Sequence, residues 1–290
     1  MERKGVLNMI FSLLGGDARS VYLYRSLCAD GHEARAFALE RRLPDCAGNA
    51  EEALSGADCA ILPLPCVKDG MLNAPYSETA HTPEALLCAA ASGTLIFAGN
   101  APAELCGYCR ERGLELADYG KREDFTLRNA ELTAEGALSL LLNGPQKKKS
   151  LRESRVLVAG FGRIGRALAE KLTALGASVT VAARGAAART AAELAGCTAV
   201  SLADVPFDRF DAVVNTIPSP VFGRDALERF GDARLIELAS PPYGLVPAAA
   251  EQLGKRIELA AGLPGKTAPA SAAEAVKKTI YAILRSERIP

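Results

Sequence analysis

A glycine-rich segment carries the clearest chemical signal in the sequence. Its six residues, 160–165, read Gly-Phe-Gly-Arg-Ile-Gly, directly after the apolar run 156–159 and at the start of a helical pattern. The first glycine permits a tight turn, the second lets backbone approach a pyrophosphate, and the third lets the helix pack against the strand. The helix N-terminus adds free N–H groups and the positive end of its dipole. We therefore predict a dinucleotide-binding site at Gly160, Gly162, Arg163, Ile164 and Gly165.

The residues after the next strand, 178–182, indicate which dinucleotide is bound. An NAD site usually has an acidic residue there to hold the ribose 2′-hydroxyl, but positions 182–185 read Ala-Ala-Arg-Gly. The Arg184 guanidinium can instead hold a 2′-phosphate, and Arg189 lies close in sequence. We expect NADP, with NAD as the alternative cofactor and a solvated loop arginine as the alternative interpretation of Arg184.

A further strand, 212–215, ends in a polar segment. Parallel sheets bind dinucleotides at the carboxyl ends of their strands. We therefore expect this segment beside the nicotinamide and its ribose, and predict four more cofactor-binding residues: Asn215, Thr216, Ile217 and Pro218.

Strands and helices alternate along both halves of the chain. Strands are predicted at 6–14, 33–39, 58–62, 94–98 and 114–118, and again at 156–159, 178–182, 212–215, 235–238 and 257–259. This alternation predicts an α/β protein with two Rossmann-like, doubly wound parallel-sheet domains. The final amphipathic helix, 271–286, is expected to pack back on the first domain. We assign 1–132 with 270–290 to a substrate-binding domain and 133–269 to an NADP-binding domain.

The composition excludes several classes of protein. Lys plus Arg and Asp plus Glu number 34 each, so no global charge favours nucleic acid or an anionic membrane. The basic run 147–149 is interpreted as a solvated linker or helix end. No apolar segment approaches the ~20 residues that span a bilayer, and no cleavage site follows the first apolar run. Cys106 and Cys109 form a CxxC without the second ligand pair of a zinc site. We expect a cytoplasmic protein without a metal.

Five segments together resemble one known family, the A subunit of dipicolinate synthase, the oxidoreductase that makes pyridine-2,6-dicarboxylate in spore-forming bacteria. They run in the family's order over nearly the whole chain, at 15–19, 129–136, 160–165, 215–218 and 261–269. The sequences GGDAR near the start and GLPGKTAP near the end are far more specific than the glycine fingerprint. The family pattern leads us to expect proline where Leu132 stands and glycine where Tyr243 stands.

The resemblance implies an NADP-linked oxidation of dihydrodipicolinate, or of its hydrated precursor, in the mother-cell cytoplasm during sporulation. It also implies a flavoprotein-like partner, the B subunit of the synthase, and leaves a homodimer open. Aromatisation of the ring drives the loss of hydride, so the protein chiefly orients the donor carbon against the nicotinamide. We expect His32 and His81 at the surface and name no catalytic residue.

A planar ring with two carboxylates needs anion-binding groups at both ends. Gly16, Asp17 and Arg19 stand at a predicted helix start, where N–H groups and a guanidinium suit an anion. Gly265 and Lys266 stand in a predicted tight turn after the last strand. Each segment has a structural alternative as an ordinary turn of the fold.

Four more residues complete the predicted substrate site. Asn129, Thr133 and Glu135 lie at the expected domain junction, where Thr133 is also a candidate helix N-cap. Ser240 follows a predicted strand. We expect the whole set in a cleft between the two halves, because doubly wound sheets bind ligands at strand ends.

Two other functions fit parts of the sequence. A shikimate-dehydrogenase-like NADP reductase would use Lys68 in a lysine–aspartate pair, but its Asn-Thr-Asp signature is absent from 99–102. A non-catalytic dinucleotide-binding subunit would carry the same glycine fingerprint, because sensing and catalysis bind the cofactor alike.

Overall fold

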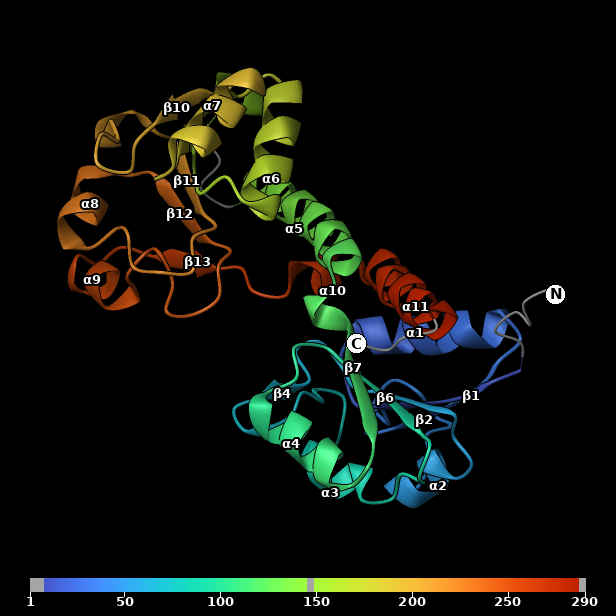
Figure 1. Ribbon diagram of the computed structural model, residues 1–290. Helices are drawn as coiled ribbons and strands as arrows, with labels where there is room; N and C mark the ends of the chain where they lie inside the picture. Colours follow the sequence, from blue (N-terminus) through green and yellow to red (C-terminus); the bar gives the residue numbers. More distant parts are fainter. Residues whose placement is uncertain (1–7, 145–148, 287–290) are drawn as a thin grey trace. The chain divides into compact units, whose positions relative to one another are not determined.

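The computed structural model describes residues 8–144 and 149–286 (Figure 1). The chain divides into two compact units, one made of the residues up to Asn129 with those from Ala268 on, the other of Ala130–Thr267. Val6 and Leu7 of the first predicted strand, and Lys147 and Lys148 of the basic run, lie outside the described residues. Within the described ranges, no helix combines the length and apolar character needed to cross a membrane.

The first unit is built on a parallel sheet. Within its described residues, five strands pair in the order β2-β1-β3-β6-β7, so the order reverses between β1 and β3. The strands are β1 Ile10–Leu14, β2 Glu33–Phe37, β3 Cys59–Ile61, β6 Leu95–Ala98 and β7 Glu115–Asp118. A short antiparallel pair that the sequence did not indicate, β4 Val67–Lys68 with β5 Met71–Leu72, follows β3.

Helices cover both faces of this sheet. Phe11 and Leu13 of β1 point into the core under one face, whereas Leu14 points into the core under the other, as the two-residue repeat of a strand requires. The first face is covered by α1 Ala18–Ala29 and α11 Pro269–Arg285, the second by α2 Ala50–Leu54, α3 Pro83–Leu87 and α4 Ala103–Glu111. Figure 1 shows α11 lying beside α1, which confirms that the last helix packs on the first domain.

A buried lysine joins these two helices. The Lys277 ammonium lies 2.8 Å from Asp30 and 3.1 Å from Glu274, and it donates a hydrogen bond to the Ser26 hydroxyl. The Tyr281 hydroxyl donates to the same Asp30 carboxylate at 2.9 Å. Because α11 arrives from the far end of the sequence, these charge-assisted contacts help to define its register on α1.

The second unit has the strand order of a dinucleotide-binding Rossmann fold. Six strands among its described residues run parallel in the order β10-β9-β8-β11-β12-β13, with the reversal between β8 and β11. They are β8 Arg155–Ala159, β9 Ser178–Ala182, β10 Thr198–Val200, β11 Ala212–Asn215, β12 Arg234–Glu237 and β13 Ile257–Leu259. One face packs against α5 Glu123–Asn143, α6 Arg163–Ala174, α7 Ala186–Leu194 and α10 Leu263–Thr267; the other packs against α8 Arg224–Arg229 and α9 Pro247–Gln252. The predicted fold class is confirmed.

Helix α5 is longer than the sequence suggested. The expectation that Thr133 caps a new helix is wrong, since α5 runs without a break from Glu123 to Asn143. Ala130, Glu131 and Leu132 favour helix, and no glycine or proline interrupts the first three turns. Leu132 therefore lies in a helix interior, where no turn exists for a proline to shape.

The predicted tight turn around Gly265 is also wrong. Residues 263–267 form the short helix α10, which tolerates Pro264 because the N–H that proline lacks has no intrahelical acceptor in the first turn. Gly136 of α5 lets α10 approach closely, since a Cβ at that position would lie only 2.8 Å from the Leu263 Cβ. The position of Lys266 thus depends on a helix–helix contact.

His32 is buried, which contradicts the expectation of a surface histidine. Its ring packs edge-on against Phe11 and Tyr281, and its Nδ1 accepts a hydrogen bond from the Met9 N–H. Burial lowers the pKa of His32 below its ordinary value of 6.5, although the nearby Asp30 carboxylate opposes the shift.

This burial predicts a loss of stability in mild acid. In the unfolded chain His32 takes up a proton near pH 6.5, whereas in the folded protein it does so only at lower pH. The free energy of unfolding should therefore fall as pH drops below about 6.5, by at most about 1.4 kcal/mol per pH unit. The measurement is chemical denaturation between pH 7.5 and 5. His32→Asn keeps an acceptor for Met9 but does not titrate, so its stability should change less over this range. A His32→Asn curve parallel to the parent's would contradict the assignment.

Candidate dinucleotide-binding site

The glycine fingerprint forms the turn between β8 and α6. Gly160 has a φ of +92°, in the left-handed region that favours glycine, and its N–H donates to the Ala182 carbonyl. A Cβ on Gly165 would lie 2.2 Å from the Gly160 carbonyl oxygen, so only glycine lets α6 approach the strand this closely. A Cβ on Gly162 would meet no atom within 4 Å, so the backbone at the helix N-terminus is open to a pyrophosphate. Arg163 and Ile164 form the first turn of α6, where they were predicted.

The segment after β11 packs against this turn. The Thr216 hydroxyl donates to the Ala159 carbonyl at 2.8 Å, and a Cβ on Gly160 would lie 2.5 Å from that hydroxyl. Ile217 also reaches this turn, whereas Pro218 is exposed. The two segments therefore lie on either side of the point where the strand order reverses, which is the position of dinucleotides in doubly wound sheets.

A buried carboxylate that the sequence did not single out supports the same edge. Glu237, the last residue of β12, is 1% exposed and accepts hydrogen bonds from the Asn215 amide and from the N–H groups of Ala239, Gly244 and Leu245. Burial raises the pKa of Glu237, and these donors oppose the rise. The only signal in the sequence was an acidic residue ending an apolar strand.

Arg184 and Arg189 have different environments. The exposed Arg184 side chain extends from the end of β9 and donates to the Ser219 hydroxyl at 3.3 Å. Arg189 donates to the carbonyl oxygens of Ala183 and Arg184, so it braces the backbone of this loop. Arg184 is therefore the guanidinium that can reach a ligand, and Arg189 holds its loop in place.

Three predicted substrate residues of the first unit, Gly16, Asp17 and Arg19, follow the carboxyl end of β1. Gly16 has a φ of +111°, and Asp17 caps α1 by accepting from the Arg19 N–H. The Arg19 guanidinium forms a two-pronged ion pair with Asp17 and also donates to the Leu64 carbonyl. Its Nη1 makes no hydrogen bond to any described residue. Arg19 thus already joins two loops, and Nη1 is the nitrogen that remains for an anion.

Three predicted substrate residues lie on α5. Asn129 and Thr133, four residues apart, share one side of the helix, and Thr133 is buried. Glu135 is exposed. It follows Thr133 by two residues, a rotation of about 200° about the helix axis, so its side chain leaves the opposite side of α5. The structure therefore does not place Glu135 with the other two.

The remaining predicted substrate residues belong to the second unit. Gly265 is buried and Lys266 exposed on α10, while Ser240 is exposed in the loop after β12. Tyr243 in that loop has a φ of +62°, which explains why glycine was expected there. The Ser240 loop lies at the dinucleotide edge of the sheet, because Glu237 binds it from within.

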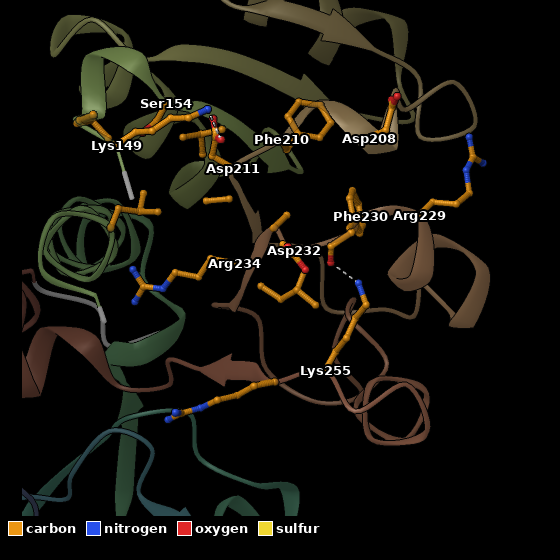
Figure 2. A pocket seen from close by; sticks show the side chains of 18 of the residues that line it. Lys149, Ser154, Asp208, Phe210, Asp211, Arg229, Phe230, Asp232, Arg234 and Lys255 are labelled. Carbon is orange, nitrogen blue, oxygen red and sulfur yellow. Dashed lines mark hydrogen bonds and ion pairs between the residues drawn. The ribbon is translucent and has the colours of Figure 1, made fainter. Parts of the chain in front are cut away.

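A hollow of about 740 Å³ lies at the opposite edge of this sheet (Figure 2). Its walls include Val156, Ala212 and Leu235, at the amino ends of β8, β11 and β12. Lys149 pairs with Asp211 at 2.8 Å, and Arg234 binds Glu258 and the Leu140 carbonyl, so two of its cations already have partners. The hollow is separate from the dinucleotide edge.

The fingerprint geometry predicts the effect of adding one methyl group. Gly165→Ala should force α6 away from β8, lower stability by about 1–3 kcal/mol, and weaken dinucleotide binding. Gly223→Ala is the matched control, because a Cβ there meets no atom within 4 Å and its backbone is extended. Thermal denaturation and fluorescence titration with NADPH and NADH measure both effects. Parent-like behaviour of Gly165→Ala would show that the helix does not sit this close to the strand.

Two family models match separate stretches of the chain. Residues 10–120 match the N-terminal domain of the A subunit of dipicolinate synthase. Residues 134–232 match the NAD binding domain of D-isomer specific 2-hydroxyacid dehydrogenases. The second stretch includes the glycine fingerprint, Arg184 and the segment after β11, so the match and the geometry point to the same edge of the second sheet.

Whole-length comparisons lead to the same relatives. The chain is 28% identical to the A subunit of dipicolinate synthase from Bacillus subtilis (strain 168), over 94% of this chain and 95% of that protein. The crystal structure of the A subunit from Bacillus halodurans matches with a TM-score of 0.85 and 23% identity, covering 98% of this chain and 100% of that one. The crystal structure of the Bacillus subtilis protein matches with a TM-score of 0.81 and 25% identity, covering 97% of each chain. The crystal structure of a transhydrogenase from Sinorhizobium meliloti shares the fold with a TM-score of 0.69 and 17% identity, covering 96% of this chain and 93% of that one.

The sequence motifs, the strand orders and the comparisons therefore agree. The second unit contains a nicotinamide-dinucleotide-binding domain of the dehydrogenase type, as expected of an NAD(P)-dependent oxidoreductase. The predicted resemblance to the A subunit of dipicolinate synthase is confirmed over nearly the whole length of the chain.

Proposed function

We propose that this chain is the oxidoreductase subunit of a dipicolinate-forming enzyme. It would oxidise dihydrodipicolinate, or its hydrated precursor, by hydride transfer to NADP. The observation that carries the proposal is the combination of a dehydrogenase-type dinucleotide edge in one unit with a first unit that matches the N-terminal domain of the synthase's A subunit. The dehydrogenase-type match alone would be compatible with many other oxidoreductases.

The proposal of NADP rests on the end of β9. An acidic side chain there would repel a 2′-phosphate, but the residues that follow Val181 are Ala182, Ala183 and Arg184. The exposed Arg184 guanidinium has only a 3.3 Å hydrogen bond to Ser219 to give up. Helix α7 begins two residues later, so the free N–H groups and the dipole at its N-terminus would add to the attraction for a 2′-phosphate.

The protein's tasks in this reaction are to bind and orient. NADP⁺, when bound, accepts the hydride that leaves the ring. The N-terminus of α6 would hold the pyrophosphate, and the loops after β11 and β12 would face the reacting carbon. One hydride and one proton leave a dihydropyridine as it becomes aromatic, and the hydrated precursor additionally loses water. Because the driving force lies in the ring, orientation is the main contribution required of the chain.

The nine predicted substrate residues remain part of the proposal. Among them, Arg19 and Lys266 are the cations we assign to the two carboxylates. Six other residues of the set would bind or position the ring: Gly16, Asp17, Asn129, Thr133, Ser240 and Gly265. Glu135, on the opposite side of α5 from Thr133, is the member of the set that the helix geometry supports least.

The decisive assay follows NADP⁺ reduction with freshly generated dihydrodipicolinate, using the chain alone and then with the B subunit of dipicolinate synthase. Reduction by the chain alone identifies it as the oxidoreductase, and reduction only with the B subunit identifies a protein that depends on its partner. Tight dinucleotide binding without turnover in either case would favour a non-catalytic, dinucleotide-sensing role.

Cofactor preference gives a separate prediction. Arg184→Ala should weaken NADPH binding by about 1.5–3 kcal/mol, the range for a hydrogen bond to a charged group, and leave NADH binding nearly unchanged. Fluorescence titration of both dinucleotides measures the difference. Arg224→Ala, which changes an exposed arginine of α8, is the control and should alter neither affinity. Equal affinities of the parent for NADPH and NADH would refute the NADP assignment.

The role of Arg19 can be tested with the product. Dipicolinate should raise the melting temperature of the parent by binding the folded state, and Arg19→Leu should abolish that rise. A charged pair lost from a desolvated site costs about 2–5 kcal/mol, so the apparent dissociation constant should increase about 30-fold or more. Arg25→Leu, an exposed arginine on the same helix, should retain the parent's response.

The opposite result has a clear structural meaning. If dipicolinate protects Arg19→Leu as well as the parent, Arg19 serves only to tie the start of α1 to the loop at Leu64.

A further inference from the structure

The strand order of the second unit assigns the two halves of a dinucleotide to different loops. Doubly wound sheets bind one mononucleotide on each side of the point where the order reverses. Arg184 follows β9 on the β8-β9-β10 side, so the adenosine half belongs there. The nicotinamide half therefore lies over β11, β12 and β13, where the segment after Asn215 and the Ser240 loop emerge.

These two loops meet at a single carboxylate. Glu237 Oε1 lies 2.7 Å from the Asn215 Nδ2 and 2.8 Å from the Ala239 N, and Oε2 lies 3.0 Å and 2.9 Å from the N atoms of Gly244 and Leu245. The carboxylate thus closes the Ser240 loop on itself at both ends, at 239 and at 244–245. It also ties this loop to the segment after β11.

The chemistry of this contact suits an ionised glutamate. All four groups that face the carboxylate are N–H donors, so two acceptor oxygens satisfy every one of them. A glutamine would turn an NH₂ group toward an N–H, and a buried donor would lose its partner. Packing leaves little freedom to adapt, because a Cβ on Gly244 would already lie 2.3 Å from the Asn215 Nδ2.

The same contacts extend along both loops, and the segment after β11 reaches the adenosine side through the 3.3 Å hydrogen bond that its Ser219 hydroxyl accepts from Arg184, which involves none of the groups bound to the Glu237 carboxylate. Asn215 also donates to the Ile217 carbonyl and accepts from the Ile217 N–H. The Gly244 carbonyl accepts from the N–H groups of Val221 and Phe222. The hydrogen bonds of the Glu237 carboxylate among the described residues all go to these two loops, so loss of the carboxylate should disturb one half of the site selectively.

We propose that Glu237 is a positioning residue for the nicotinamide half of the dinucleotide. Its carboxylate holds the Asn215 segment and the Ser240 loop in the one arrangement that accepts the nicotinamide and its ribose. The inference rests on the proposed function, because it assumes that a nicotinamide dinucleotide binds this edge.

The experiment compares a whole dinucleotide with its adenosine half. NADPH and 2′,5′-ADP are titrated by calorimetry against the parent, Glu237→Gln, Glu237→Asp and Glu258→Gln. Glu237→Gln should raise the dissociation constant of NADPH about tenfold or more and leave that of 2′,5′-ADP within about twofold. Glu237→Asp keeps the charge and should recover part of the NADPH affinity. Glu258→Gln removes a carboxylate from the neighbouring strand β13 and should change neither ligand.

Other outcomes would overturn the inference or its basis. A merely structural glutamate would weaken both ligands together, and an irrelevant one would weaken neither; both results overturn the inference. Gly244→Ala is a second variant that leaves the charge in place but crowds Asn215, and it should show the same selective loss of NADPH. A parent that binds neither NADPH nor NADH would instead refute the proposed function.

Discussion

The contact between Gly165 and the Gly160 carbonyl is the constraint on which the second unit depends. It brings the N-terminus of α6 directly above the carboxyl end of β8, so that free N–H groups and the helix dipole point at one place. The segment after β11 then packs on the same turn through Thr216, because no side chain stands between them. The absence of three Cβ atoms therefore creates the anion-binding edge more than any charged side chain does.

Three buried or half-buried cations of the described residues are already compensated within the chain. Arg19 is paired with Asp17, Lys277 with Asp30 and Glu274, and Arg234 with Glu258. Desolvation offsets most of the Coulombic gain of such pairs, so their clearer contribution is to fix how loops and helices are registered. Arg184 differs, because its side chain is exposed and its contact with Ser219 is long. This contrast, rather than the number of arginines, distinguishes a ligand-binding candidate from a structural one.

The sequence predictions that were wrong share one cause. Thr133 was expected to cap a helix, residues 262–266 to form a turn, and His32 to lie at the surface, each judged from its immediate neighbours. In the structure Thr133 lies inside the long helix α5, Gly136 lets α10 pack against α5, and the aromatic rings of Phe11 and Tyr281 enclose His32. Helix packing and burial decided these positions, and both involve residues far apart in the sequence.

The sequence by itself determined the alternation of strands and helices, the fingerprint turn, the missing acid after β9 and the resemblance to a family. These are local properties: apolar periodicity, glycines at fixed spacing, and residue types at strand ends. Only the tertiary structure decided which strands are neighbours, where the strand order reverses, that Arg19 is already paired, and that Glu237 joins two loops. The physical reason is that a hydrogen bond between Asn215 and Glu237 depends on the pairing of β11 with β12, which no local pattern specifies.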